Sequence, residues 1–135
     1  FREFIPLFDL SGVAFYSLQI GDASNEIDQL GYTGFVADLQ PFMKTWGQTA
    51  SVIQALDVLV TVDTAIAHLA GALGKPVIML NYYDSCWRWQ RDSEKTPWYD
   101  SMTITRQQRQ GDWSPCIERA RELLEQRRGV LEIAA

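Results

Sequence analysis

The stretch Val60–Leu80, VTVDTAIAHLAGALGKPVIML, decides the fold of this chain. Its two ends are apolar runs of strand length, and they flank a segment of alanine, glycine and leucine with helical spacing. We expect a strand over Val58–Val62, a helix over Thr64–Leu73 and a strand over Val77–Leu80. Gly74 suits the position just past such a helix. The two strands should therefore be parallel neighbours, joined by a right-handed crossover through the helix.

The rest of the chain continues this alternation of strands and helices. Further strands are expected over Val13–Leu18, Phe35–Ala37 and Met102–Arg106, and further helices over Ser24–Leu30, over Gln48–Leu56 and from Ser114 to a stop at Gly129. The longer strands are continuous apolar runs, which are typical of a sheet covered by helices on both faces. The sequence therefore predicts an α/β fold, with a Rossmann-like parallel sheet of about four or five strands and flanking helices.

The composition limits the class of protein. With 135 residues, 47% of them hydrophobic and 21% charged, the chain has the size and core content of one ordinary globular domain. The net charge of −5 argues against a nucleic-acid partner, and no apolar run has the roughly 20 residues of a membrane-spanning helix. Two cysteines, Cys86 and Cys116, are too few for a disulfide framework or a zinc site, which indicates reduced thiols in a cytoplasmic protein.

The N-terminus indicates that the chain is part of something longer. It begins with phenylalanine rather than methionine, and its first apolar residues follow the spacing of one helix face. These residues are Phe1, Phe4, Ile5 and Phe8. Because a domain is not expected to open inside an amphipathic helix, we take residues 1–135 as a single domain within an N-terminally truncated fragment.

The residues that follow the central strand predict an anion site. Ligands of open parallel sheets bind at the carboxyl ends of the strands, and Asp63 lies at such an end. The first amides of the helix, at Thr64, Ala65 and Ile66, have no partner inside the helix, and the helix dipole adds a positive potential. A phosphate placed there would meet these amides and the Thr64 hydroxyl.

His68, the only histidine of the chain, lies one turn further along the same helix. The apolar face that is expected to pack on the sheet carries Ile66, Leu69, Ala70 and Leu73. His68 falls on another face with Ala65 and Ala72, whose small side chains would let a ligand approach closely. An imidazole in this position can donate a hydrogen bond to a phosphate oxygen.

Purely structural roles could explain the same residues. Asp63 could cap the helix, and the alanines could allow tight packing against a neighbouring helix. His68 could be a structural hydrogen-bonding residue. The segment also has neither the Walker sequence nor the Gly-x-Gly-x-x-Gly of dinucleotide-binding proteins. The residues by themselves leave both interpretations open.

Two longer motifs carry a resemblance to a known family. VTVDTAIAHLAGALGKPV, followed by WRWQRDSEKTPWYDSMTITRQQRQGDW, resembles the C-terminal region of bacterial glycosyltransferases related to the ADP-heptose:lipopolysaccharide heptosyltransferases. The branch associated with tetratricopeptide repeats is the most similar, and the resemblance runs from about Val13 to Trp113. It implies the GT-B architecture, in which two Rossmann-like domains face a cleft and the C-terminal one holds the nucleotide sugar.

The resemblance assigns roles around the expected anion site. Asp63, Thr64 and Ala65 would form a turn against the donor diphosphate, and His68 would reach the same group. Arg88 could bind a phosphate through two parallel hydrogen bonds, or it could pair with a neighbouring carboxylate. The carboxylates in question are Asp92 and Asp100.

The resemblance also assigns roles near the nucleoside. The loop SLQIGDASNE would lie beside it, with Gln19 and Gly21 near the base. Glu26 would accept hydrogen bonds from the ribose hydroxyls, or it is a solvated helix residue.

Some positions depart from the pattern of this family. Gln48, Thr49 and Ala50 stand where Asp-Thr-Ala is often found, and Ser85–Cys86 stands where an aspartate is expected. The contacts that this loop makes with a sugar are therefore not carried over. The loop is rich in aromatic residues that could stack on a sugar or base, or cover the edge of the sheet. They are Trp87, Trp89, Trp98 and Tyr99.

These observations predict the nucleotide-sugar-binding domain of a glycosyltransferase that uses no metal ion and no other cofactor. The full enzyme would transfer a sugar from a nucleoside diphosphate to an acceptor, and helix amides, Thr64 and His68 would stabilise the diphosphate leaving group. The expected partners are the nucleoside diphosphate sugar and an N-terminal acceptor domain outside this sequence. Alone, the chain should be inactive and should form a homodimer through an apolar patch that the absent parts would cover.

Two other functions stay open. The first is a non-catalytic binding or interaction module that keeps the glycosyltransferase fold. Asp63, Thr64 and His68 argue against it, while the altered aromatic loop favours it. The second is a small α/β domain of the flavodoxin or receiver type, which the long aromatic loop fits poorly.

Overall fold

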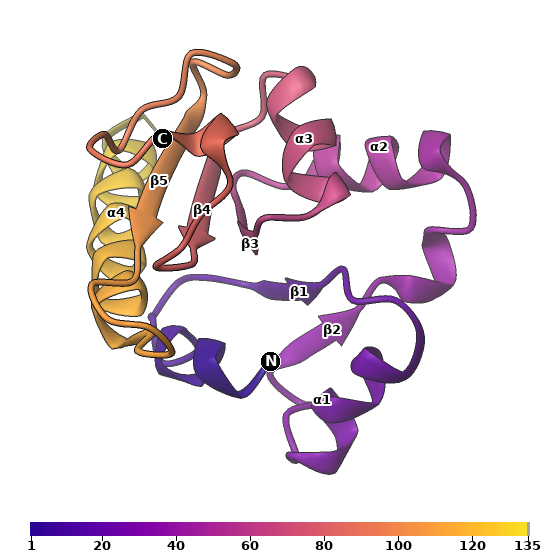
Figure 1. The fold of residues 1–135 in the computed structure, drawn as a ribbon. Helices are drawn as coiled ribbons and strands as arrows, with labels where there is room; N and C mark the ends of the chain where they lie inside the picture. The colour runs from indigo at the N-terminus through magenta and orange to yellow at the C-terminus, as the bar shows by residue number, and fades with distance from the viewer. Residues whose placement is uncertain (135) are drawn as a thin grey trace. The chain divides into compact units, whose positions relative to one another are not determined.

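The computed structural model describes residues 1–134, and its contacts divide the chain into two compact units, Phe1–Val52 and Ile53–Ala135 (Figure 1). Each unit contains its own parallel sheet. The sequence predicted one sheet of about four or five strands. The strands instead form a two-stranded sheet, β1-β2, and a three-stranded sheet, β3-β4-β5.

Unit 1 is built from short elements. They are η1 (Arg2–Leu7), β1 (Phe15–Ser17), η2 (Gly21–Asn25), α1 (Glu26–Gln29), β2 (Val36–Asp38) and η3 (Gln40–Phe42), followed by α2 (Trp46–Ala55), which includes the boundary between the units. Strands β1 and β2 pair in parallel, with Phe15 opposite Val36. Strand β1 is shorter than the expected Val13–Leu18, and β2 begins and ends one residue later than the expected Phe35–Ala37.

The expected amphipathic helix at the N-terminus is wrong. The segment η1 is a 3₁₀ helix that contains Pro6, which has no backbone N–H to donate. A 3₁₀ helix has three residues per turn rather than 3.6, so the apolar spacing of an α-helix does not describe this segment. The buried residues are Leu7 and Leu10, whereas Phe1, Phe4, Ile5 and Phe8 stay partly exposed.

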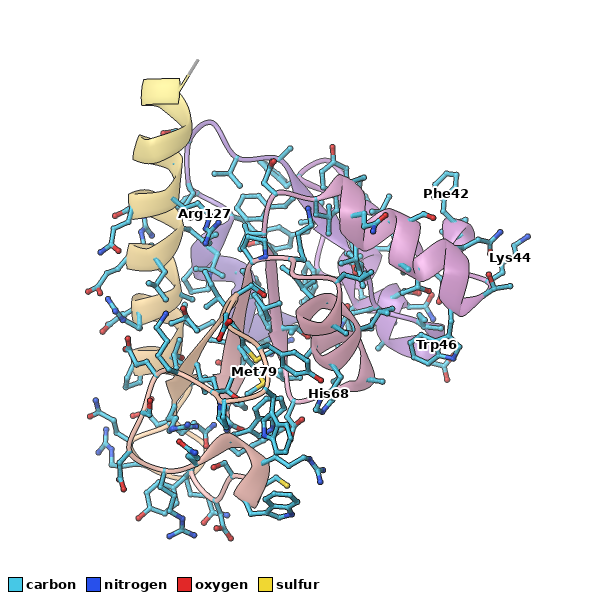
Figure 2. All side chains as sticks on the ribbon, turned by 90° about the horizontal axis from the view of Figure 1, so that it is seen from above. Phe42, Lys44, Trp46, His68, Met79 and Arg127 are labelled. Atoms are coloured by element: carbon cyan, nitrogen blue, oxygen red, sulfur yellow. The ribbon has the colours of Figure 1, made fainter. Side chains whose placement is uncertain are left out.

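Unit 2 is a three-layer α/β arrangement. Its elements are β3 (Leu59–Val62), α3 (Ala65–Ala72), β4 (Val77–Asn81), η4 (Trp87–Trp89), β5 (Met102–Arg106) and α4 (Ser114–Ala134). The helices α3 and α4 lie on opposite sides of the sheet, and Met79 of the central strand lies between them (Figure 2). Every residue of β4 is buried, as the continuous apolar run predicted.

The prediction of two parallel neighbouring strands joined through a helix is confirmed. Strands β3 and β4 are parallel neighbours connected through α3, with Leu59 opposite Val77. Strand β5 pairs in parallel on the other edge of β4, with Met79 opposite Ile104. The class is therefore α/β, with parallel sheets and flanking helices, and it is compatible with a Rossmann-like fold. The last helix differs in length, because α4 continues past Gly129 to Ala134.

Gly74 ends α3 as expected. Its backbone φ is +68°, which is the left-handed region that glycine adopts without strain. The Gly74 amide donates to the carbonyl of Gly71 at 3.0 Å, and the Lys75 amide donates to the carbonyl of Ala70 at 3.0 Å. This pair of bonds is the Schellman motif, which satisfies the last helix carbonyls and turns the chain toward β4.

Replacing Gly74 by alanine should lower the free energy of unfolding by about 1 kcal/mol, because an alanine pays the cost of a positive φ. Nothing lies within 4 Å of the added Cβ, so no steric clash contributes. Chemical denaturation of the parent chain and of G74A measures the difference. Gly34→Ala is the control, since that position also has open space but no positive φ, and equal effects of both changes would contradict the expectation.

A bidentate ion pair fastens the loop before β5 to α4. The Arg119 Nε and Nη2 atoms donate to the two carboxylate oxygens of Glu94, each at 3.0 Å. These hydrogen bonds lower the pKa of Glu94 below its ordinary value. The Glu94 carbonyl also accepts from the amide of Ile104 at 2.8 Å, so the same residue is tied to both α4 and β5.

Arg119→Ala should lower the melting temperature by a few degrees at most at neutral pH, because this pair is largely solvent-exposed. A carboxylate whose pKa is lower in the folded than in the unfolded chain stabilises the fold at pH values above its unfolded pKa. This contribution is lost as the pH falls toward the pKa of the folded chain. The difference between parent and variant should therefore shrink below about pH 4.3, the ordinary glutamate value. Melting curves across this range test it.

Arg91→Ala serves as the control for this experiment, because Arg91 and Asp84 form a pair whose side chains are 75% and 87% exposed. Its melting temperature should match the parent at every pH. A deficit in Arg119→Ala that is equally large at neutral and at acidic pH would contradict a role for the Glu94 carboxylate.

Candidate functional site

The three parallel strands of unit 2 end at the same edge of the sheet. Asp63 follows β3 directly, Asn81 is the last residue of β4, and Arg106 is the last residue of β5. Asn81 and Arg106 are opposite each other in the register of the two strands. Among the residues at the ends of strands, the sequence analysis named only Asp63. The structure places two more polar residues, Asn81 and Arg106, at the same ends.

The start of α3 differs in detail from the expected helix. Thr64 occupies the N-cap position with extended backbone angles, φ −143° and ψ 168°, and no side chain caps the helix. Asp63 therefore does not cap it, so this structural explanation of Asp63 is wrong. The Thr64 hydroxyl lies 3.5 Å from the hydroxyl of Thr61. Within residues 1–134 the amides of Ala65 and Ile66 have no hydrogen-bond acceptor, so they are free to bind an anion.

The buried face of α3 is rotated from the expected one. The helix buries Ala67, Ala70 and Gly71, while the larger apolar residues of the predicted face are only partly covered. These residues are Ile66, Leu69 and Leu73. The reason is that small residues let a neighbouring aromatic loop pack closely against the helix, and this loop covers the side that carries His68.

His68 is held by two aromatic residues of that loop. Its Nδ1 atom forms a hydrogen bond with the hydroxyl of Tyr99 at 3.0 Å. Its ring stacks on Trp89, with centroids 5.0 Å apart and planes inclined by 28°. The Nε2 atom lies 4.0 Å from Asp63 Oδ1, which is too far for a hydrogen bond. The His68 side chain is 37% exposed, and among residues 1–134 its Nε2 atom forms no hydrogen bond (Figure 2).

Arg106 fixes the loop that carries these aromatic residues. Its Nη2 atom donates to the carbonyl oxygens of Trp89 and Ser93. Burial lowers the pKa of the Arg106 guanidinium from its ordinary value. Around these strand ends, three buried donor atoms have no acceptor among the residues that the structure describes, namely Arg106 Nη1, Trp89 Nε1 and Asn81 Nδ2. This edge thus carries an excess of hydrogen-bond donors.

Arg88 lies on the exposed side of the same loop. Its guanidinium carbon is 5.6 Å from the centroid of the Trp87 ring, and its carbonyl accepts from Trp98 Nε1 at 3.0 Å. Among the described residues Arg88 forms no ion pair with Asp92 or Asp100, so the carboxylate pairing left open by the sequence is not formed. Trp87 and Trp98 are 75% and 53% exposed, whereas Trp89 is fully buried.

Three of the predicted residues belong to unit 1. The Gln19 amide donates to Ser17 Oγ at 3.3 Å, and the Gln19 Oε1 atom is buried without a partner among residues 1–134. Gly21 has φ +74°, and its amide donates to Gln40 Oε1. The carboxylate of Glu26 lies 3.2 Å from the backbone nitrogen of Phe1.

A cavity of about 300 Å³ lies in unit 1, lined by residues of α1 and β2 and their neighbours. Its polar lining includes Ser24, Asn25, Asp28, Asp38 and Gln40. None of Gln19, Gly21 and Glu26 lines it, so the structure does not bring these three predicted residues into this cavity.

The sequence analysis named Tyr99 only as one of four loop aromatics, without its contact to His68, and it missed Asn81 and Arg106 altogether. The last two carried a usable signal, because each is a polar residue that ends an otherwise apolar strand. Tyr99 carried none, since nothing in its spacing shows that it reaches a helix 31 residues earlier in the chain.

The chain is thus an α/β protein, compatible with a Rossmann-like fold, in which the carboxyl ends of the strands of unit 2 lie beside hydrogen-bond donors without acceptors among the described residues. Residues 33–125, more than half of the chain, match glycosyltransferase family 9 (heptosyltransferase), and the matched range includes β3, β4 and β5. The chain therefore belongs to glycosyltransferase family 9. This agrees with the resemblance of its motifs to glycosyltransferases related to the heptosyltransferases.

One curated relative is Protein FlbA of Caulobacter vibrioides, which is 30% identical over 124 residues. The match covers 88% of this chain and 20% of FlbA, so the chain spans about a fifth of the length of that relative. No solved structure matches the chain.

Two further properties concern metal binding and membrane-spanning helices. In residues 1–134 no group of three or more histidine, cysteine, aspartate or glutamate side chains is placed to bind a metal ion. No helix in this range combines the length and the apolar character needed to span a membrane.

Replacing Arg106 by methionine should loosen the aromatic loop. A hydrogen bond from a charged donor contributes about 1.5–3 kcal/mol. Losing both bonds, to Trp89 and Ser93, should therefore raise the open population of the loop at least about tenfold. Limited trypsin digestion measures this opening as faster cleavage after three exposed basic residues of the loop. These residues are Arg88, Arg91 and Lys95.

Arg109→Met is the matched control for that experiment. Arg109 is 83% exposed and pairs locally with Asp112, so its loss should leave cleavage in the loop unchanged. Equal cleavage rates in R106M and the parent chain would show that Arg106 does not hold the loop.

Proposed function

We propose that this chain binds a nucleoside diphosphate sugar as the donor-binding domain of a glycosyltransferase, with the diphosphate at the start of α3. The observation that carries the proposal is the arrangement at that helix end. The amides of Ala65 and Ile66 lack acceptors in residues 1–134, and His68 is held with Nε2 free of any hydrogen bond there. Membership of glycosyltransferase family 9 supports the choice of a nucleotide sugar as the ligand.

The chemistry of sugar transfer suits this arrangement. When the bond between the sugar and the diphosphate breaks, negative charge develops on the leaving phosphate oxygens. Two amides, the exposed Thr64 hydroxyl and the His68 imidazole can each donate a hydrogen bond to such an oxygen. The transfer is proposed to need no metal ion, because these donors and the helix dipole take up the developing charge.

Asp63 is proposed to act through its neighbours rather than on the phosphate. Its side chain is only a quarter exposed, and an ionised carboxylate would repel a diphosphate. The His68 Nε2 atom lies 4.0 Å from Asp63 Oδ1, so the carboxylate would act on the orientation of the imidazole, and Nε2 would donate to the ligand.

Other contacts with the donor complete the proposal. The guanidinium of Arg88, which forms no ion pair with the described carboxylates, would bind a phosphate through a bidentate contact. Gln19, Gly21 and Glu26 would serve the nucleoside, and the buried Oε1 atom of Gln19, without a partner in residues 1–134, supports a contact of that kind.

The wider setting is part of the same proposal. Residues 1–135 would act as the C-terminal, donor-binding domain of a GT-B enzyme of the bacterial, tetratricopeptide-associated branch. An acceptor domain outside this sequence would supply the other wall of the cleft, so the chain alone would be inactive and would pair with a second copy. The free thiols Cys86 and Cys116 fit a cytoplasmic protein.

His68→Ala should weaken the binding of the preferred nucleoside diphosphate by roughly tenfold to a hundredfold, the value of one hydrogen bond to a charged group. Isothermal titration of the parent and variant chains with UDP, ADP and GDP measures the affinities. His68→Phe should lose affinity to the same extent while it keeps a ring stacked on Trp89.

Arg91→Ala is the control for nonspecific attraction between the loop and an anion, because Arg91 is exposed and paired with Asp84. It should bind the nucleotide as the parent does. If none of the three nucleotides binds the parent chain, or if both His68 variants bind like the parent, the proposed site is wrong. Nucleotide binding without any sugar transfer by the enzyme that carries this domain would favour a non-catalytic binding module.

A further inference from the structure

We infer that Tyr99 is a positioning residue that keeps the Nε2 atom of His68 as a hydrogen-bond donor, and that Gly71 is the residue that admits Tyr99 to this place. The inference deepens the proposed function and rests on it for its catalytic meaning. Its structural part concerns the contacts of the Tyr99 side chain with His68 and with the backbone at Gly71, and it is testable without any nucleotide.

The surroundings of the two ring nitrogens favour one tautomer of the imidazole. A neutral imidazole has one donor and one acceptor nitrogen. Nε2 lies 4.0 Å from Oδ1 of Asp63, which is too far for a hydrogen bond, but the charge of an ionised carboxylate favours a proton on this nitrogen. Nδ1 then accepts from the Tyr99 hydroxyl at 3.0 Å, and this direction is favoured because a phenol is a better donor than acceptor.

The same contact serves the protonated imidazole. In that state both ring nitrogens donate, and the Tyr99 hydroxyl rotates so that its oxygen accepts from Nδ1. Nε2 carries a proton in either state. A hydroxyl at this position therefore gives the site a donor on Nε2 that does not depend on the protonation of the ring.

Gly71 makes this contact sterically possible. A Cβ atom at position 71 would lie 2.5 Å from Cγ of Tyr99 and 2.7 Å from its Cδ2. Such distances are far below van der Waals contact, and the obstruction is the base of a ring rather than the end of a flexible chain. Gly71 is buried and lies one turn after His68, so the Tyr99 ring covers both residues on one face of α3.

The stacking on Trp89 fixes the plane of the imidazole but not its tautomer. An aromatic ring offers no hydrogen bond to either ring nitrogen in its own plane. Trp89 and Tyr99 thus have separate tasks at His68: the first sets the orientation of the ring, and the second determines which nitrogen accepts.

The test uses the fact that His68 is the only histidine of the chain. Long-range proton–nitrogen NMR correlation on ¹⁵N-labelled protein, prepared without a polyhistidine tag, therefore shows one imidazole. At a pH where histidine is neutral, the parent should show Nε2 protonated and Nδ1 unprotonated as essentially the only form. Tyr99→Phe should shift Nδ1 toward the averaged value of two exchanging tautomers.

Gly71→Ala should give the same shift as Tyr99→Phe although it leaves the hydroxyl in the sequence. Tyr83→Phe is the matched control, because it removes the hydroxyl of another exposed tyrosine in the same loop and should change nothing at His68. A proton on Nδ1 in the parent, or a spectrum that Tyr99→Phe leaves unaltered, would overturn the inference. Amide spectra show in the same experiment that each variant is folded.

Nucleotide binding then tests the link to function. Tyr99→Phe should weaken the best-bound nucleoside diphosphate several-fold in the parent chain and should have no effect in the His68→Ala background. An equal loss in both backgrounds would mean that Tyr99 contacts the nucleotide directly, which would overturn its role through His68. If no nucleotide binds the parent chain, the proposed function fails, whereas the imidazole spectra still decide the role of Tyr99.

Discussion

Parallel pairing of β3, β4 and β5 is the constraint on which the rest of unit 2 depends. Because the three strands run the same way, Asp63, Asn81 and Arg106 end at one edge, and the chain must cross the sheet between strands. The crossover through α3 directs the N-terminus of that helix to this edge, where the amides of its first turn are available to an anion. The anion site proposed at this position would thus be a consequence of strand direction, with His68 and Thr64 as its further donors.

Features that depend on local pattern could be predicted from the sequence. The apolar runs identified β3 and β4, and Gly74 identified the end of α3, since each depends on residues that are close in the chain. The failures have a different origin. The 3₁₀ helix at Pro6 and the rotation of α3, which buries Gly71 rather than Leu73, depend on packing between distant segments, which no periodicity records.

The same distinction applies to the candidate site. Asp63, Thr64 and His68 could be singled out because they belong to one strand–helix turn, although their roles as ligand contacts stay predictions. The contacts that orient His68 come from residues 89 and 99, on a loop whose path depends on charge-assisted hydrogen bonds to backbone carbonyls. A sequence shows the aromatic character of such a loop but not which ring is buried: Trp89 is fully buried, while Trp87 two residues earlier is largely exposed.

The loop between β4 and β5 is held by the fully buried Trp89 and by a few polar contacts. Arg106 binds its backbone at Trp89 and Ser93, and Arg119 of α4 binds Glu94. Because Tyr99 lies on the same loop, these ties and the hydrogen bond to His68 form one connected series from α4 to α3. Charge-assisted bonds of this kind are stronger than neutral ones, so each of them contributes to holding the loop in place. Residues of β5 and α4 thus support the loop that places Tyr99 against His68.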